Sequence, residues 1–357
     1  MKTIVHISEV NICLNSGMGR VEYYWKLAFE KSGYKFIHIG PNEVGKLRFK
    51  SFFGFYAYVF YKKMNVKATA FIVHEPLSGY FVNKGIPCFL ESHGIEIRAR
   101  QVFKKYKLNA DNKNNIRNYL FNIYRNFYSI KGIKNVDKLL LLNTEDKEFL
   151  LNKFKRKESD IFIYKNGIHQ LNLVNKTLNY HFTILFNGSY IKRKGIDILI
   201  DAAKIISDRI DNLKFLLIGT GYTKEDIIEK WPNEIRDKVT IIPKFNSEDE
   251  ASYLSQTDLF VLPSFYEGQP LSLLQAMSAG ICCITTNTCG QKDIIEHYKN
   301  GLLFDPGNSL QLANLIIEMK NNVQKRTDIG INAKLSIQDR SWTKCSNELV
   351  NYITKQI

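Results

Sequence analysis

One stretch of the chain, residues 258–280, constrains the fold more than any other. It reads DLFVLPSFYEGQPLSLLQAMSAG. Leu259–Leu262 is a short apolar run followed by a proline, which predicts a buried parallel strand. Residues 264–269 are polar and contain a glycine, so they predict a loop. Pro270 fits the first position of a helix, because its φ is already set and it lacks an N–H, and Gly280 fits the helix end.

A second apolar run, Ile281–Thr285, follows that helix and completes a strand–helix–strand unit. Open α/β sheets bind ligands at the carboxyl ends of their strands, where this loop and helix start would lie. Free backbone N–H groups at a helix N-terminus favour an anion such as phosphate. Glu267 adds a carboxylate to the same loop. The stretch therefore predicts a ligand site that combines an anion-binding helix start with an acidic side chain.

These residues resemble the sugar-nucleotide site of the retaining glycosyltransferases of family 4, within the glycosyl transferases group 1. That family carries a strand ending in Pro-Ser, then Glu-Gly, then a helix with a second Glu, then Ala-Met-Ala-x-Gly. This chain matches the pattern at Pro263-Ser264, Glu267-Gly268 and Ala276-Met277-Ser278-Ala279-Gly280. It departs at the second Glu, which is Gln275 here.

The alternation of strands and helices continues over most of the chain. In the first half, apolar runs predict strands at residues 4–8, 71–74, 87–91, 138–142 and 161–164. In the second half they predict strands at residues 182–186, 214–218, 239–243, 259–262, 281–285 and 301–304. Such alternation in each half predicts the α/β class, with two doubly wound parallel-sheet domains.

The resemblance implies the GT-B architecture, in which two Rossmann-like domains face each other across a cleft and a C-terminal helix crosses back to the first domain. We therefore expect an N-terminal acceptor-binding domain at residues 1–167 and a polar linker at 168–180. A sugar-nucleotide-binding domain is expected at 181–335, and the returning helix at 336–357.

A glycine-containing turn follows the first predicted strand, with Gly17 and Gly19 ahead of a helix predicted from Val21 to Lys31. Glycines there let the backbone approach a ligand closely, although a tight turn explains them equally well. The family has a Gly-Gly loop at this place that faces the donor diphosphate. The resemblance thus implies that both glycines contact the donor.

The resemblance also implies three catalytic residues: Lys194, Glu267 and His93. Lys194 would stabilise the donor diphosphate, Glu267 would hold hydroxyls of the transferred sugar, and His93 would hydrogen-bond a sugar hydroxyl. Each has a simpler explanation. Lys194 fits a solvated loop lysine, Glu267 a carboxylate that caps a helix, and His93 a histidine satisfied at a strand end.

Further donor contacts are implied around these three. The position of a family arginine is Ser189 here, and Arg193 is the candidate replacement. Gln275 can still accept and donate hydrogen bonds to the ribose hydroxyls. Phe245 would stack on the nucleobase. The other implied donor-binding residues are Lys244, Gly268, Gln269, Pro270 and Leu271.

The excess of positive charge lies in the first half of the chain. Residues 1–165 contain 29 Lys and Arg against 14 Asp and Glu, whereas residues 166–357 contain 21 of each kind. A basic surface suits nucleic acid, an anionic membrane or an acidic small substrate, and a Lys-rich composition that raises solubility is the simpler explanation. Residues 46–67 form an aromatic run with basic ends, which suits either a helix on an anionic membrane or a helix packed on the sheet.

Other sequence features concern the compartment. No apolar run reaches the ~20 residues of a membrane span, and no signal-peptide core follows Met1. The six cysteines show no metal-ligand spacing. We therefore expect a cytoplasmic protein with reduced thiols, peripheral at the inner face of the plasma membrane.

The predicted function is a retaining glycosyltransferase that needs no cofactor and, without an Asp-x-Asp motif, no metal. It would move a hexose or N-acetylhexosamine from a nucleotide-diphosphate sugar, with UDP the commonest carrier. The expected acceptor is a lipid-linked saccharide or a polysaccharide of bacterial surface glycan synthesis, such as O-antigen or capsule. The alternatives are a catalytically impaired family member, an epimerase or phosphorylase of the same architecture, and a non-enzymatic protein that binds nucleic acid or membrane.

Overall fold

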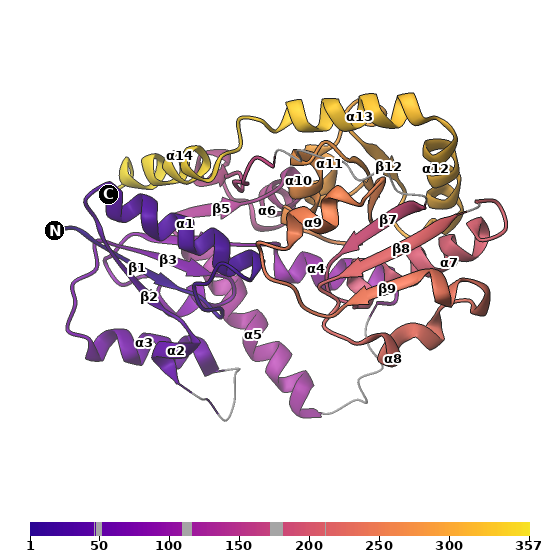
Figure 1. Cartoon of the computed structure of the whole chain (residues 1–357). Coiled ribbons are helices and arrows are strands. Elements are labelled where there is room, and N and C mark those ends of the chain that lie inside the picture. Colours follow the sequence, from indigo (N-terminus) through magenta and orange to yellow (C-terminus); the bar gives the residue numbers. More distant parts are fainter. Residues whose placement is uncertain (46, 48–51, 109–115, 172–180, 211) are drawn as a thin grey trace. The chain divides into compact units, whose positions relative to one another are not determined.

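The computed structural model describes residues 1–45, 47, 52–108, 116–171, 181–210 and 212–357 (Figure 1). The chain divides into two compact units. Unit 1 comprises residues 1–101, 109–167 and 342–357, and unit 2 comprises residues 102–108 and 168–341. Each unit contains a parallel sheet, so the predicted class of two doubly wound α/β domains is confirmed.

Over the described residues, unit 1 is built on a six-stranded sheet in the order β2-β1-β3-β4-β5-β6. The strands are β1 (Thr3–Ile7), β2 (Lys35–Ile39), β3 (Ala70–His74), β4 (Cys88–Glu91), β5 (Lys138–Leu141) and β6 (Ile161–Ile163). The α-helices are α1 (Gly17–Lys31), α2 (Pro41–Val44), α3 (Phe53–Lys63), α4 (Glu96–Lys105), α5 (Ile116–Asn135), α6 (Thr144–Phe154) and α14 (Trp342–Thr354). The order reverses between β1 and β3, and open sheets bind ligands beside such a point.

The first strands of unit 1 lie in its core, since a parallel sheet is covered on both faces. Every residue of β1 and β3 is buried. Two ionisable side chains, His6 in β1 and Glu91 at the end of β4, are also fully buried. The sequence analysis did not predict β2, whose Phe36 and Ile39 contribute to the core.

The C-terminal helix α14 belongs to unit 1, as predicted. Trp342 stacks on Tyr24 of α1 with ring centroids 4.5 Å apart, and Tyr352 stacks on Phe162 of β6 at 4.1 Å. The helix begins later than the predicted residue 336, because another helix occupies the chain up to that point.

Unit 2 has a six-stranded sheet in the order β12-β11-β10-β7-β8-β9, again over the described residues. Its strands are β7 (Phe182–Asn187), β8 (Leu213–Ile218), β9 (Val239–Ile242), β10 (Leu259–Leu262), β11 (Cys282–Thr286) and β12 (Leu302–Phe304). Its helices include η4 (Lys192–Lys194), α7 (Ile196–Ile206), α8 (Lys224–Ile227), α9 (Glu250–Ser255), α10 (Leu271–Ser278), α11 (Cys289–Ile294), α12 (Ser309–Asn321) and α13 (Val323–Ser336). Numbered from β7, this is the Rossmann order 3-2-1-4-5-6, which reverses between β7 and β10.

Helix α10 follows the sequence pattern closely. Pro270 lies at the N-cap rather than at the first helical position, one residue earlier than predicted. Leu274 is buried, and Gly280 adopts a φ of +73° just after the helix. Helix α13, which was not predicted, packs backbone to backbone on this turn: a Cβ at Gly330 would lie 2.2 Å from the carbonyl oxygen of Gly280.

The aromatic run at residues 46–67 forms α3, and part of the run lies outside the described residues. Phe53 and Tyr61 are buried in the core of unit 1. Phe55 and Tyr56 are 48% and 45% exposed. One face of the helix therefore packs on the domain, and the other face is open to a partner.

Two predictions from composition can be compared with the fold. Among the described residues, none of the helices is both long and apolar enough to cross a membrane. All six cysteines lie in the described part of the chain, where none forms a disulfide and five are buried.

Candidate active site

The loop of residues 263–270 carries the predicted motif from β10 to α10, and every residue in it is buried. Gln291 of α11 donates from Nε2 to the carbonyl oxygen of Ser264 at 3.3 Å. Gly290 packs directly on the loop, since a Cβ there would lie 1.7 Å from the carbonyl oxygen of Gly268. These contacts hold the backbone of the loop in place at the carboxyl edge of the sheet.

Gly195 brings the basic turn η4 against this loop. It adopts a φ of +72°, and a Cβ would lie 1.9 Å from the carbonyl oxygen of Pro263, so only glycine fits. Lys194 Nζ lies 2.6 Å from Glu267 Oε1, and Arg193 Nη1 lies 3.4 Å from Glu267 Oε2. The structure thus brings together two predicted cations and the predicted carboxylate.

The charge of Glu267 is set by these neighbours. Burial opposes ionisation, but Lys194 and Arg193 outweigh it and lower the pKa of the carboxyl group to about 2. The side chains of Glu267 and Lys194 are 9% and 15% exposed, so salt screens their ion pair only weakly. The start of α10 adds backbone N–H groups to the two cations. This arrangement can bind an anion that is linked to a hydroxylated group.

The remaining predicted residues of the loop have different surroundings. Gly268 and Pro270 are buried in the loop, and Leu271 opens α10. The side chain of Gln269 accepts a hydrogen bond from Arg340 Nη1 at 3.0 Å. The structure therefore ties Gln269 to a neighbouring segment of unit 2.

The residues predicted for the base follow β9, and the residue predicted for the ribose lies in α10. Phe245 follows β9, and its ring lies beside Gly219, where a Cβ would be 3.2 Å from it. Lys244 is exposed. Gln275 donates from Nε2 to Oε2 of Glu250, a residue that the sequence analysis did not single out.

Gly17 and Gly19 lie inside the first turn of α1, not in a loop before a helix that begins at Val21. Ser16 caps this helix and accepts a hydrogen bond from the Gly19 N–H at 3.0 Å. A Cβ at Gly19 would lie 2.6 Å from the carbonyl oxygen of Asn11. Packing of the preceding loop therefore explains Gly19 without a ligand.

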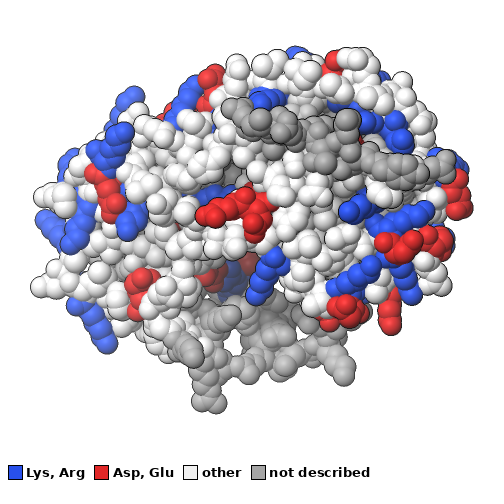
Figure 2. All heavy atoms as spheres, viewed as in Figure 1, with Lys and Arg blue, Asp and Glu red and all other residues white. Residues whose placement is uncertain are grey.

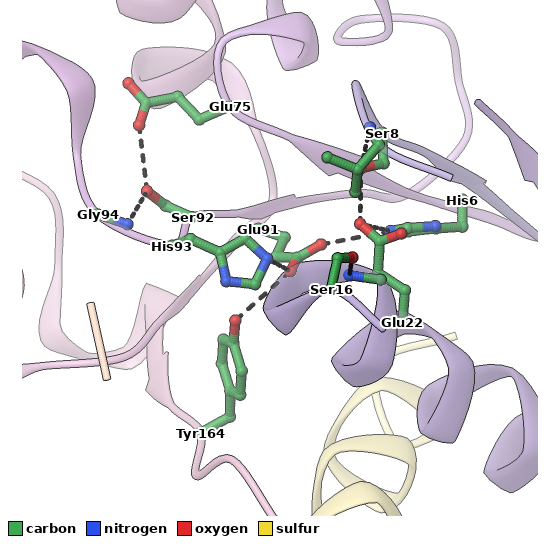
Figure 3. A network of polar contacts seen from close by, with 12 residues as sticks. His6, Ser8, Ser16, Glu22, Glu75, Glu91, Ser92, His93, Gly94 and Tyr164 are labelled. Atoms are coloured by element: carbon green, nitrogen blue, oxygen red, sulfur yellow. Dashed lines mark hydrogen bonds and ion pairs between the residues drawn. The ribbon is translucent and has the colours of Figure 1, made fainter. Parts of the chain in front are cut away.

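His93 lies in unit 1 at one end of a buried polar network (Figure 3). His93 Nε2 is 2.8 Å from Oε1 of Glu91, whose Oε2 is 3.3 Å from His6 Nε2. His6 Nε2 is also 4.0 Å from Oε1 of Glu22. Ser8 Oγ donates to the same oxygen of Glu22 at 2.6 Å. Strands β1 and β4 and helix α1 each supply members of the network.

His38 determines which nitrogen of His6 titrates. His38 Nε2 lies 3.1 Å from the carbonyl oxygen of Val10, so it carries the proton of a neutral imidazole. His38 Nδ1 then accepts from His6 Nδ1 at 3.0 Å, which leaves His6 Nε2 facing Glu22 and Glu91. Burial lowers the pKa of His6, but the two carboxylates outweigh it, and the net pKa is raised.

The pKa values of the two glutamates of the network, Glu22 and Glu91, are shifted in opposite directions. Burial favours the protonated form of both. For Glu91, His93 and His6 outweigh burial and hold the pKa well below its usual range. For Glu22, burial dominates over the opposing effect of His6 and raises the pKa to about 7. The network thus contains a permanent carboxylate and a carboxyl group that titrates near neutral pH.

Two triads in this network have the spacing of metal ligands. His6, Glu22 and His38 form one, and Glu22, Glu91 and His93 form the other, with donor atoms within 4.8 Å of one another. Imidazole nitrogen and carboxylate oxygen suit zinc and related ions. The same atoms also pair with one another as imidazoles and carboxylates, and that pairing accounts for their arrangement.

Sequence reasoning identified His93 but missed His6, Glu22, Glu91 and Glu250. A signal existed for His6 and Glu91, because ionisable residues in apolar strands are rarely buried without a partner. The partners themselves could not be identified from neighbouring residues in the sequence, since His6 and Glu91 are 85 positions apart.

Comparisons with known proteins show which family unit 2 is similar to. Residues 175–336 match the family model of glycosyl transferases group 1. An uncharacterized glycosyltransferase of Methanocaldococcus jannaschii is 30% identical over 211 residues, or 59% of this chain and 57% of the relative. The UDP-Gal:alpha-D-GlcNAc-diphosphoundecaprenol alpha-1,3-galactosyltransferase of Escherichia coli is 24% identical over 282 residues, or 75% of this chain and 65% of the relative. The chain therefore matches less than two thirds of the length of either relative.

Among solved structures, sucrose-phosphate synthase from Thermosynechococcus elongatus superposes with a TM-score of 0.82, over 100% of this chain and 99% of that one. The two sequences are 16% identical, so the likeness concerns the fold. It confirms the predicted GT-B architecture.

Proposed function

We propose that this chain, whose residues 175–336 match the family model of glycosyl transferases group 1, moves a sugar from a nucleotide-diphosphate sugar to a saccharide acceptor. The observation that carries the proposal is the cluster of Lys194, Arg193 and Glu267 beside the N-terminus of α10. The cluster lies where the Rossmann strand order reverses. It offers cations and N–H groups to a diphosphate and a carboxylate to sugar hydroxyls.

In the proposed reaction, the bond between the sugar C1 and the diphosphate oxygen breaks. The acceptor oxygen bonds to C1 from the same face, so the anomeric configuration is retained, and the acceptor proton passes to the leaving diphosphate. Lys194, Arg193 and the N–H groups of α10 stabilise the charge that develops on that diphosphate. Glu267 holds the sugar hydroxyls and thereby aligns C1. Because these groups supply the positive charge, the proposal includes no metal and no cofactor.

In unit 1, His93 is the proposed contact to a sugar hydroxyl. Glu91 holds its Nε2 at 2.8 Å and so orients the ring. Its side chain is 16% exposed, which leaves part of the ring accessible to a substrate. Glu91 is thus a positioning residue for His93.

The proposed donor is a UDP-linked hexose or N-acetylhexosamine, and the proposed acceptor is a lipid-linked saccharide of bacterial surface glycan synthesis. The name of the Escherichia coli relative supports both parts, because it gives UDP-Gal and a diphosphoundecaprenol-linked GlcNAc as substrates of that protein.

A lipid-linked acceptor would bring this chain to the inner face of the membrane as a peripheral cytoplasmic protein. Exposed Phe55 and Tyr56 on α3, together with Lys62 and Lys63 in its last turn, suit such a surface. On the face drawn in Figure 2, basic and acidic side chains of the described residues are interspersed and form no single basic patch. We assign the membrane contact to the exposed face of α3.

A catalytically impaired family member is the alternative, motivated by Ser189 and Gln275. We propose a replacement for each. Arg193 contacts Glu267 itself, and Gln275 contacts a second carboxylate, Glu250. A protein that only binds nucleic acid or membrane leaves the buried cluster of Lys194 and Glu267 without a role.

The test is transfer from UDP-glucose, UDP-galactose and their N-acetylated forms to a diphosphoundecaprenol-linked GlcNAc, with the product linkage read by NMR. We expect one donor to react with retention, and Lys194→Ala to lower turnover by about 100-fold or more. Lys192→Ala, in the same turn but exposed, should leave turnover unchanged. An inverted linkage would contradict the mechanism, and equal turnover in Lys194→Ala would contradict the site.

A further inference from the structure

Glu250 is a buried carboxylate at the start of α9, 5% exposed. Two side-chain amides orient it. Asn187 Nδ2 donates to its Oε1 at 2.9 Å, and Gln275 Nε2 donates to its Oε2. Asn187 ends β7 and Gln275 lies in α10, so the carboxylate is held between the two elements that flank the reversal of strand order.

The surroundings of Glu250 fit a nucleoside. Gly219 follows β8 with a φ of +68°, and a Cβ there would lie 3.5 Å from Asn187 Oδ1 and 3.2 Å from the ring of Phe245. The ring of Phe245 is partly exposed and is fixed edge-on by Tyr253, with centroids 5.8 Å apart. Gly219 lets this ring pack on the backbone beside Asn187, and a planar base can stack on the exposed part of the ring.

The distance of Gln275 and Glu250 from the proposed diphosphate site also fits a ribose. Gln275 follows Leu271 by four residues, so it lies on the same face of α10, about 6 Å further along the axis. The N-terminus of α10 carries the proposed diphosphate contacts. A group held at Gln275 and Glu250 is therefore placed about one sugar ring away from the diphosphate.

We propose that Glu250 is the carboxylate that binds the ribose of the nucleotide, and that Gln275 and Asn187 are positioning residues for it. The inference rests on the proposed function. A carboxylate offers about four acceptor sites on its two oxygens, and the 2′- and 3′-hydroxyls of a ribose can donate to them. Gln275 is then part of a functioning site, because a glutamate there would face Glu250 with like charge.

The experiment measures the affinities of UDP, GDP and ADP, and of their 2′-deoxy counterparts, by titration calorimetry. In the wild type, the bound nucleotide should lose about 10-fold in affinity without its 2′-hydroxyl. In Glu250→Gln, affinity for the ribonucleotide should fall about 10- to 100-fold, and the preference over the deoxynucleotide should disappear. The exposed neighbour gives a matched control: Glu248→Gln should keep both the affinity and the preference.

Exchanging the side chains of Glu250 and Gln275 tests whether binding needs the carboxylate at position 250 itself or only one carboxylate and one amide at the two positions. Gln275→Glu alone should weaken binding, because it places a second carboxylate against Glu250. The double variant Glu250→Gln/Gln275→Glu restores one carboxylate and one amide, so it should recover most of the lost affinity and the preference for ribose. Inorganic pyrophosphate should bind all variants alike, which checks that the diphosphate site is intact.

An unchanged preference for ribose in Glu250→Gln, with pyrophosphate still bound, would overturn this inference and leave the proposed function standing. Stronger binding by Gln275→Glu would also overturn it. If no nucleotide binds the wild type, the proposed function fails, and this inference fails with it.

Discussion

Lys194 Nζ lies 2.6 Å from Glu267 Oε1, in an ion pair that is almost entirely buried at the carboxyl edge of the second sheet. Each side chain holds the other in position before any ligand arrives. A diphosphate would compete with Glu267 for Lys194, and sugar hydroxyls would compete with Lys194 for Glu267. The pair therefore preorganises the two halves of the proposed donor site.

Glu267→Gln should separate nucleotide binding from turnover. The substitution removes the anion that pairs with Lys194, so the lysine becomes fully available to a diphosphate. We expect UDP to bind at least as tightly as in the wild type, whereas turnover falls by about 100-fold or more because the sugar is no longer aligned. Calorimetry and a steady-state assay measure the two effects. A large loss of UDP affinity would place Glu267 on the nucleotide instead of the sugar.

Gly195→Ala should damage the site through the backbone. Its Cβ would meet the carbonyl oxygen of Pro263 at 1.9 Å, and the positive φ adds strain. Gly221→Ala is the matched control, because its φ is +76° but no atom lies within 4 Å of its Cβ. In the control, the unfolding free energy should fall only by the cost of a positive φ, about 1–2 kcal/mol. In Gly195→Ala it should fall further, and UDP should also bind more weakly. Urea unfolding that gives equal losses would contradict the close approach.

The free energy of unfolding should decline as the pH rises through neutrality. Burial raises the pKa of Glu22 from 4.5 to about 7, against the opposing effect of His6, so the folded protein binds this proton more tightly than the unfolded chain. Such a group stabilises the fold below its unfolded pKa, and the stabilisation is lost as the pH rises through the folded pKa. The raised pKa values of His6, Glu75 and His93 act with the same sign. Burial lowers the pKa values of His38 and His74 from 6.5 to about 3, which acts with the opposite sign below about pH 6.5, so the decline is expected above that pH.

Glu22→Gln removes one of these groups and can keep the hydrogen bond from Ser8 through its amide oxygen. The decline in stability between about pH 5 and about pH 8 should then be shallower than in the wild type, by up to about 3 kcal/mol. Denaturant unfolding at the two pH values measures it. Parallel declines in the two proteins would show that Glu22 does not titrate in this range.

The fold was predictable because its determinants are local. Apolar runs ended by proline or glycine located β10 and α10 to within a residue, and Lys194 and Glu267 were each singled out by a motif that resembles the family. Strand β2 was missed, since Lys35–Ile39 is a short alternating segment beside a longer helix. The start of α1 was misplaced because Gly17 and Gly19, which usually disfavour helix, are accommodated under the Ser16 cap.

The contacts that were missed depend on tertiary structure. Glu250 meets Gln275 only because α9 and α10 converge at one sheet edge, and no local pattern around Glu250 indicates it. His6 and Glu91 meet because β1 and β4 lie in the same sheet with β3 between them. Sequence position does not show such neighbours, whereas the fold does.

The exposed face of α3 should contribute to membrane binding. Replacing Phe55 and Tyr56 with Ser removes apolar area but leaves the buried face of the helix intact. Co-sedimentation with phosphatidylglycerol-containing vesicles should weaken by about 10-fold or more. Tyr222→Ser, at a similarly exposed aromatic of unit 2, is the control. Sedimentation that is the same for all three proteins, at low and at high salt, would exclude α3 as the contact.

The most direct test of the account is a thermal-shift measurement with UDP, GDP, ADP and CMP on the wild type, Lys194→Ala and Lys192→Ala. At about 100 times its Kd, a specific nucleotide should add ~2.7 kcal/mol to the stability of the folded protein. The account predicts a clear shift with one diphosphate in the wild type and Lys192→Ala, and its loss in Lys194→Ala. A shift of equal size in Lys194→Ala, or no shift with any nucleotide in the wild type, would contradict the claim that this lysine and Glu267 form a sugar-nucleotide site.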